Sequence, residues 1–143
     1  MNETEIATRC RDAMWENDTA VRDMGMDVKV EGPGSAIASL EIRQRMVNGH
    51  DLCHGGYIFA LADSAFAYAC NTYDRVTVAA SAGIEFVRPA RLGDRLRAEA
   101  REAHRGGRTG VYDIEVTNQD GELVAIFRGR SYATREPLLK SDT

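Results

Sequence analysis

The sequence predicts an α+β fold in which a curved antiparallel sheet of about six strands wraps around one long central helix. The stretch 57–70 is apolar at every position except Asp63 and Ser64, a pattern typical of a helix packed on all sides. Segments with the two-residue period of β-strands precede and follow it. A sheet covers such a helix on all sides only by curling around it, so the two observations together define the fold class.

The part of the chain before the central helix predicts a covering helix and two strands. Residues 4–16 carry apolar side chains at helical spacing, and residues 19–24 predict a further helical turn. Residues 26–30 and 35–42 have strand-like patterns around a turn rich in glycine and proline at 31–34.

Four strands are predicted after the central helix, at residues 76–87, 95–103, 111–117 and 123–134. In the first of them, alternation places one set of side chains on a common face: Val76, Val78, Ala80, Ala82, Ile84 and Phe86. Because short turns join these segments, we expect strands that are neighbours in sequence to pair as antiparallel hairpins. Residues 1–135 then form one domain, and residues 136–143 form a polar tail that we expect to be disordered.

Composition narrows the class of protein. The chain has 143 residues, enough for one domain with a real core. Its net charge of −4 argues against nucleic acid as a partner, and no apolar run is long enough to span a bilayer. Three widely spaced cysteines without a secretion signal predict free thiols in the cytoplasm.

The polar, glycine-rich stretch 48–56 leads into the central helix, which we expect to begin near Gly55. Free N–H groups and the positive end of the helix dipole collect there, whereas a carboxylate such as Asp63 in an apolar helix is costly unless it is used. Asp63 follows Gly55 by eight residues, which is about 12 Å along a helix. One small reacting group can touch Gly55 of one subunit and Asp63 of another if two such helices run antiparallel across a two-fold axis. We therefore expect a homodimer with two shared sites.

The same stretch contains a recognisable motif, Asn48-Gly49, Cys53-His54-Gly55-Gly56, Phe59 and Leu61-Ala62-Asp63, followed by Phe-Val-Arg-Pro-Ala-Arg-Leu-Gly-Asp at 86–94. This motif resembles the signature of hotdog-fold acyl-CoA thioesterases of the phenylacetate-degradation (PaaI) type, and the layout agrees over nearly the whole length. The resemblance implies hydrolysis of acyl-CoA thioesters, with aryl-acyl groups such as (hydroxy)phenylacetyl. It also implies a homotetramer of two dimers and no metal or organic cofactor.

The resemblance assigns catalytic roles to residues of this chain. Asp63 is expected to act as general base toward water or as nucleophile on the thioester. The Gly55 N–H of the other subunit polarises the thioester carbonyl. Asn48 and His54 position the thioester or the water, and Ser81 supplies a hydroxyl near the attacking water.

Candidate substrate-binding residues follow from residue type and charge. Gly56 allows close approach of substrate to the backbone, and Phe59 lines the acyl pocket. Arg88 and Arg108, the latter in the turn 105–108, are candidates to hold the phosphates of coenzyme A. Surface arginines are common in this chain, so a purely solvated role for both is equally open.

Other interpretations of the site remain open at the level of sequence. A hotdog hydroxyacyl-thioester dehydratase would pair a histidine with a carboxylate across the dimer, and a non-catalytic acyl-CoA-binding module would need no acid in the helix. His50, Cys53 and His54 include metal-ligand types, but their crowding within five residues is poor geometry for tetrahedral zinc. Cys53 as a nucleophile has no identifiable base except His54.

Overall fold

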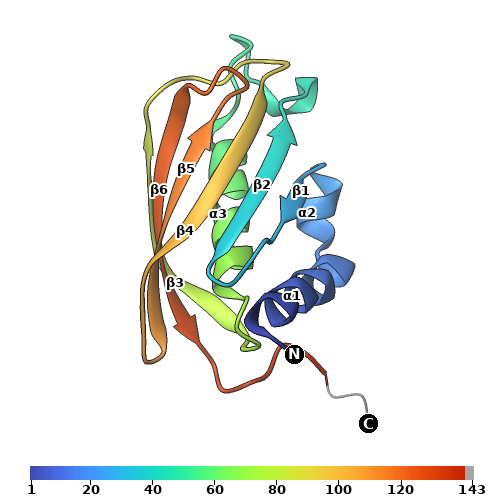
Figure 1. Ribbon diagram of the computed structural model, residues 1–143. Helices are drawn as coiled ribbons and strands as arrows, with labels where there is room; N and C mark the ends of the chain where they lie inside the picture. Colours follow the sequence, from blue (N-terminus) through green and yellow to red (C-terminus); the bar gives the residue numbers. More distant parts are fainter. Residues whose placement is uncertain (141–143) are drawn as a thin grey trace.

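An antiparallel sheet curves around helix α3 (Gly55–Cys70) in the computed structural model, which describes residues 1–140 (Figure 1). Helices α1 (Glu3–Asn17) and α2 (Thr19–Asp23) lie on the side of the first strand. The strands are β1 (Asp27–Lys29), β2 (Ser35–Glu41), β3 (Thr77–Phe86), β4 (Arg95–Gly106), β5 (Thr109–Thr117) and β6 (Leu123–Ala133), with a 3₁₀ turn, η1, at Gln44–Met46. The predicted fold class and the bounds of the central helix are confirmed.

The strands do not all pair with their neighbours in sequence. Their order in the six-stranded sheet is β1-β2-β4-β5-β6-β3, with every pairing antiparallel. The expected hairpin between β3 and β4 is therefore wrong, because β3 lies at the far edge beside β6. The connecting segment instead runs past the start of α3, where the Cys53 N–H donates to the Ala90 carbonyl at 2.7 Å. The segment 87–94 is thereby held next to the residues that lead into α3.

The sequence predicted that α3 is packed on all sides, but the structure leaves part of the helix uncovered. Most of its side chains are buried against the concave face of the sheet, but one stripe remains partly or fully exposed. The stripe follows helical spacing and consists of Gly56, Phe59, Ala60, Asp63, Ser64 and Ala67. The reason is geometric: one curved sheet covers only part of the circumference of a helix, and no other element within residues 1–140 reaches the stripe.

Strand β3 is the free edge of the sheet and is exposed on both faces. Its side chains do not alternate as the sequence predicted, since the register with β6 shifts between Ala79 and Ser81. This bulge leaves Ala80 as an extra residue and moves all later side chains to the opposite face. Ser81 then pairs with the exposed Arg130 on the outer face of the sheet, whereas Phe86 pairs with the buried Ala125 on the inner face.

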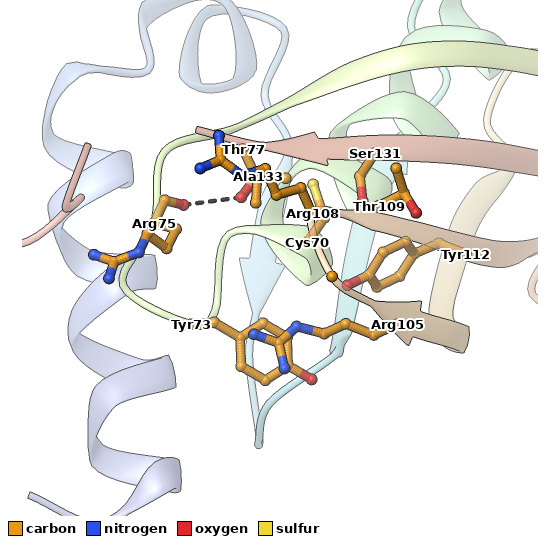
Figure 2. A pocket seen from close by; sticks show the side chains of 11 residues that line it. Cys70, Tyr73, Arg75, Thr77, Arg105, Arg108, Thr109, Tyr112, Ser131 and Ala133 are labelled. Atoms are coloured by element: carbon orange, nitrogen blue, oxygen red, sulfur yellow. Dashed lines mark hydrogen bonds between the residues drawn. The ribbon is translucent and has the colours of Figure 1, made fainter. Parts of the chain in front are cut away.

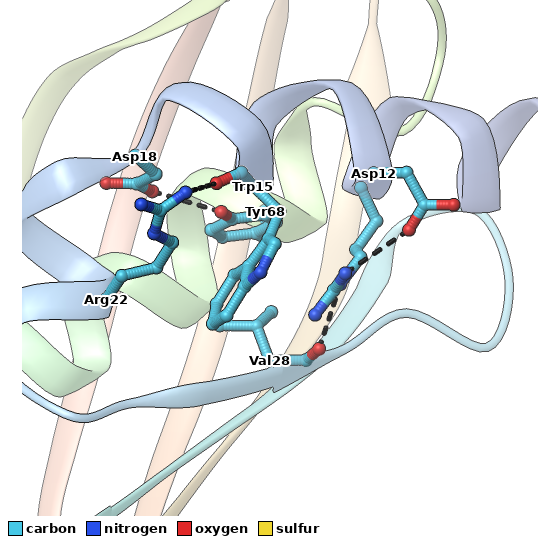
Figure 3. A network of polar contacts seen from close by, with 7 residues as sticks. Asp12, Trp15, Asp18, Arg22, Val28 and Tyr68 are labelled. Carbon is cyan, nitrogen blue, oxygen red and sulfur yellow. Dashed lines mark hydrogen bonds and ion pairs between the residues drawn. The ribbon is translucent and has the colours of Figure 1, made fainter.

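The N-terminal helices are attached to α3 by a polar contact inside an apolar interface (Figure 3). The hydroxyl of Tyr68, a buried residue of α3, donates to Asp18 Oδ2 at 3.0 Å, between α1 and α2. Burial and the neighbouring Asp18 carboxylate raise the pKa of Tyr68. On α1, the Arg11 guanidinium lies 4.5 Å from the centre of the Trp15 ring and donates to the Val28 carbonyl of β1. These contacts define α1 and α2 as a cover over one flank of α3.

A glycine in β6 sets how closely the sheet approaches α3. A Cβ added at Gly129 would lie 2.7 Å from the Phe66 ring, closer than any real contact. We expect Gly129→Ala to lower the free energy of unfolding by about 1–3 kcal/mol, the usual effect of overpacking a core. Urea unfolding measures the loss. Gly83→Ala is the matched control in neighbouring β3, where an added Cβ meets nothing, and equal destabilisation by both changes would contradict the close approach.

The C-terminal segment 136–140 makes hydrogen bonds to the loop that follows α3. The Val76 N–H donates to the Glu136 carbonyl at 2.8 Å, and the Leu139 N–H donates to Asp74 Oδ1 at 2.7 Å. Residues 136–140 therefore lie against the loop that follows α3, while residues 141–143 fall outside the described part of the chain.

Within residues 1–140, no helix is long and apolar enough to cross a membrane.

Candidate active site

Helix α3 begins with a side-chain cap that His54 supplies. His54 has extended backbone angles, and its Nδ1 accepts a hydrogen bond from the Gly56 N–H at 2.9 Å. Because Nδ1 is an acceptor in this contact, the neutral ring carries its proton on Nε2. An imidazole thus takes the place usually held by a serine or aspartate oxygen at the start of a helix. Gly56 is engaged in this cap, and an added Cβ there would lie 2.9 Å from His54 Nδ1.

The Gly55 N–H is left free at the same helix start. Within the described range 1–140, no acceptor takes this N–H, and the dipole of a 16-residue helix points its positive end toward it. A free N–H in this position is a suitable donor to the oxygen of a polarised carbonyl.

Asn48 shapes the loop that precedes the helix. Its Oδ1 accepts hydrogen bonds from the His50 N–H at 2.9 Å and the Leu52 N–H at 3.2 Å. Asp51, inside this loop, has a positive φ of 58°. The Nδ2 of Asn48 donates to no acceptor in the part of the chain that the structure describes, so this side chain offers a donor to a ligand.

An open groove of about 360 Å³ is lined in part by Gly55. Its lining combines three of the expected site residues with apolar side chains: Asn48, Leu52, Cys53, Gly55, Ile58, Phe86, Val87, Arg88 and Pro89. The structure therefore brings Arg88 together with Asn48 and Gly55, although Arg88 comes from a separate segment of the chain.

Asp63 lies in the partly exposed stripe of α3 and outside this groove. Burial raises the pKa of Asp63 above the usual range of a carboxyl group. Among residues 1–140, no hydrogen bond or ion pair engages its carboxylate. In one chain it is separated from Gly55 by about 12 Å of helix, so the two groups do not face one site within a single subunit.

Ser81 lies on the outer face of the sheet, whereas Phe59 lies on α3 against the inner face. Ser81 is on the outer face of the sheet, away from α3, so it does not meet Asp63 of the same chain. Phe59 is half-buried in the α3 stripe, and its ring packs edge-on against Phe127 with 5.2 Å between the ring centres. Phe59 therefore belongs to the core on one side and is free on the other.

The two arginines predicted to bind substrate lie at opposite ends of the molecule. Arg88, at the groove, forms an ion pair with Glu122 at 2.7 Å. Arg108 lies at the β4–β5 turn and lines a small pocket near the C-terminal end of α3, together with Arg75 and Arg105 (Figure 2).

The arginine pocket also contains hydroxyl groups, and its walls are fixed by contacts between side chains. Arg105 stacks on Tyr73 with 3.6 Å between the guanidinium carbon and the ring centre. Tyr73 and Tyr112 both donate to Glu102 Oε1, and burial together with this hydrogen bond raises the pKa of Tyr73 to about 12. The guanidinium groups of Arg105 and Arg108 border the pocket, whereas that of Arg75 points away and donates to the Asp74 carbonyl. Because no carboxylate lines the pocket within residues 1–140, its surroundings are suited to an anion.

The curved antiparallel sheet wrapped around α3 is the hotdog fold, and this fold points to a class of protein. A family model described as Thioesterase superfamily matches residues 50–125, more than half of the chain. The chain belongs to the thioesterase superfamily, which confirms the class predicted from the sequence.

The particular relatives point to the PaaI type within this superfamily. Acyl-coenzyme A thioesterase PaaI of Escherichia coli (strain K12) is 47% identical over 120 residues, which cover 84% of this chain and 86% of the relative. The structure of the E. coli PaaI protein from the phenylacetic acid degradation operon matches with a TM-score of 0.92 at 42% identity, over 95% of this chain and 99% of that chain. A Streptococcus mutans structure bound to acetyl-CoA matches with a TM-score of 0.74 at 28% identity, over 79% and 91% of the two chains. The resemblance on which the sequence analysis relied is thereby confirmed.

Sequence reasoning missed two features of the site. The alternation of residues 76–87 predicts Phe86 on the same face of a strand as Ile84, but the contact of Phe86 with Gly55 has no signal in the sequence. Arg75 joins the pocket of Arg108 because the loop after α3 runs beside the β4–β5 turn, which sequence spacing does not reveal.

Proposed function

We propose that this chain hydrolyses acyl-CoA thioesters, with aryl-acyl groups such as phenylacetyl as preferred substrates, in sites that two subunits share. The observation that carries this proposal is the pair of unused groups on α3, the free Gly55 N–H and the uncompensated Asp63 carboxylate, within the described residues 1–140. The 47% identity to E. coli acyl-coenzyme A thioesterase PaaI supports the reaction and the substrate class.

The geometry supports a simple reaction sequence. The thioester carbonyl oxygen accepts a hydrogen bond from Gly55 N–H, which stabilises the oxyanion that forms when the carbonyl carbon is attacked. Asp63 of the other subunit either takes a proton from the attacking water or attacks the carbonyl carbon itself, in which case water then cleaves the mixed anhydride. In both routes the C–S bond breaks, coenzyme A leaves as a thiolate that takes up a proton, and the free acid is released.

A second copy of the chain is the partner that this arrangement needs. The exposed α3 stripe contains small residues on both sides of Asp63, among them Ala60 and Ala67, so another helix can approach it closely. The free edge strand β3 offers unpaired backbone groups to a second sheet. Antiparallel α3 helices across a two-fold axis place Asp63 of one subunit near Gly55 of the other. Two such dimers form the proposed homotetramer, in which Ser81 contributes its hydroxyl across an interface.

We place the phosphates of coenzyme A over the mouth of the arginine pocket, because the pocket itself, at about 30 Å³, is too small to enclose a phosphate group. Cys70, which lines this pocket, follows Asp63 by seven residues, or about 10 Å of helix. The pantetheine arm is long enough to bridge from the thioester to phosphates at that distance. Arg108 is therefore the better candidate of the two predicted arginines, since Arg88 already pairs with Glu122. The cytoplasm, where coenzyme A thioesters are made and used, is the proposed compartment.

The experiment that tests the function is release of free thiol from a panel of thioesters. The panel contains phenylacetyl-, hydroxyphenylacetyl-, short aliphatic and long aliphatic CoA, together with the phenylacetyl thioester of N-acetylcysteamine, which lacks phosphates. We expect the fastest hydrolysis with the aryl-acyl-CoA substrates and a clearly higher KM for the phosphate-free thioester. If the protein binds coenzyme A but hydrolyses none of these thioesters, it is a binding module and the proposal is wrong.

Shared sites predict that two inactive variants restore each other. We expect an equimolar mixture of co-expressed Asp63→Asn and Gly55→Pro subunits to recover about a quarter of the wild-type rate, because half of randomly assembled dimers are mixed and each has one intact site. Thiol release from the mixture measures the recovery, and a different affinity tag on each variant verifies that mixed oligomers are present.

The matched control for this complementation is the pair Asp63→Asn and Asp63→Ala, which leaves no intact site in any dimer. No recovery in verified mixed oligomers of Asp63→Asn and Gly55→Pro would contradict a site that combines Gly55 of one subunit with Asp63 of the other.

A further inference from the structure

Phe86 lies directly on the helix start that holds the thioester. A Cβ added at Gly55 would be 3.1 Å from the tip of the Phe86 ring and 3.4 Å from the next ring carbon. Phe86 is the last residue of β3 and its side chain is on the inner face of the sheet. The ring therefore rests on the Cα of the residue whose N–H is the proposed oxyanion donor.

The rest of the Phe86 ring is not used by the core. Phe86 is 54% exposed, although its side chain lies on the inner face of the sheet. The exposed part lines the groove that passes Gly55, together with the apolar side chains of Leu52, Ile58 and Val87. An exposed aromatic face beside a free N–H is a surface that a ligand with a carbonyl and an apolar group can cover.

We infer that Phe86 is a specificity-determining residue that selects aryl over aliphatic acyl groups, an inference that rests on the proposed thioester hydrolysis. In a phenylacetyl thioester a single methylene separates the carbonyl carbon from the aromatic ring. When the carbonyl oxygen accepts from the Gly55 N–H, the phenyl ring of the substrate reaches the Phe86 ring, because the tip of the Phe86 ring lies against Gly55. Aromatic rings prefer offset or edge-to-face contact, and this preference is absent for an aliphatic chain of similar size.

The test compares kcat/KM for phenylacetyl-CoA and hexanoyl-CoA in wild type and in Phe86→Leu. Leucine keeps an apolar side chain at the position but removes the ring. We expect the aryl-to-alkyl ratio of kcat/KM to fall by about 2- to 12-fold, the range that an aromatic pair contributes. A loss of packing alone would lower both values together and leave the ratio unchanged. The ratio therefore separates selection of the acyl group from support of the helix start.

Tyr132→Leu is the matched control, because Tyr132 is an exposed aromatic on the outer face of the same sheet. Its ratio is expected to stay at the wild-type value. An unchanged ratio in Phe86→Leu, with wild-type hydrolysis intact, overturns this inference alone. Absence of hydrolysis in the wild type overturns the proposed function and this inference with it.

Discussion

Asp63→Asn is expected to lower the rate of thioester hydrolysis by at least about 100-fold while the fold and the oligomer persist. Asparagine has nearly the same size as aspartate, but it neither accepts a proton from water nor forms a mixed anhydride. Because no residue in the described range 1–140 pairs with the Asp63 carboxylate, its replacement leaves no partner unsatisfied. The measurement is kcat from thiol release, with gel filtration and circular dichroism as checks of assembly and fold.

The control for this variant is Ser64→Ala, the neighbouring change in the same exposed stripe. The Ser64 hydroxyl donates to the Ala60 carbonyl within α3 at 2.6 Å, so its hydrogen is already engaged inside the helix. We expect its removal to leave the rate nearly unchanged. Asp63→Asn with wild-type turnover would show that another group is the base or nucleophile.

Because the pKa of Asp63 is raised, Asp63→Asn is also expected to change how the free energy of unfolding depends on pH. Burial favours the neutral carboxyl in the folded state, so the wild type is fully stable below the unfolded-state pKa and loses stability as pH rises through the higher folded-state pKa. An asparagine side chain at this position does not titrate. We therefore expect the two proteins to be similar in stability at low pH and the Asp63→Asn variant to become the more stable one as pH rises. Urea unfolding over a pH series measures this difference, and a gap that widens toward low pH would contradict the assigned direction.

Gly55→Pro is expected to lower the rate by about 10²- to 10³-fold relative to Gly55→Ala, because it removes the N–H that polarises the carbonyl. Proline is favoured at the first position of a helix, where Gly55 lies. The preceding residue, His54, already has the extended backbone that proline requires, with φ −61° and ψ 132°. The substitution is therefore compatible with the helix start.

Gly55→Ala is the matched control because it adds the same Cβ and keeps the N–H. Both changes press on the tip of the Phe86 ring, so their difference in kcat reports the missing donor and not the crowding. Thermal unfolding of both variants checks that helix α3 persists. Equal rates in the two variants would remove Gly55 N–H from the mechanism and leave Asn48 as the remaining donor at the groove.

The sequence by itself determined where α3 begins and ends and which of its residues are candidates for chemistry. Its apolar composition predicted the helix over 55–70, and the glycines after His54 marked its start, because local composition and turn residues control where helices begin. The unusual position of Asp63 in an apolar helix identified it as a functional candidate, and its raised pKa is consistent with that choice. The motif around these residues then identified the superfamily.

Tertiary structure alone decided how these elements meet. The far-edge position of β3, the bulge at Ala80 and the resulting side of Ser81 depend on pairing between distant segments, which the two-residue period of a strand does not encode. The exposed stripe of α3 and the contact between Phe86 and Gly55 likewise arise from the curvature of the sheet. Local sequence controls which residues form helix or strand because short-range sterics and capping act there, whereas the shape of the site follows from long-range packing.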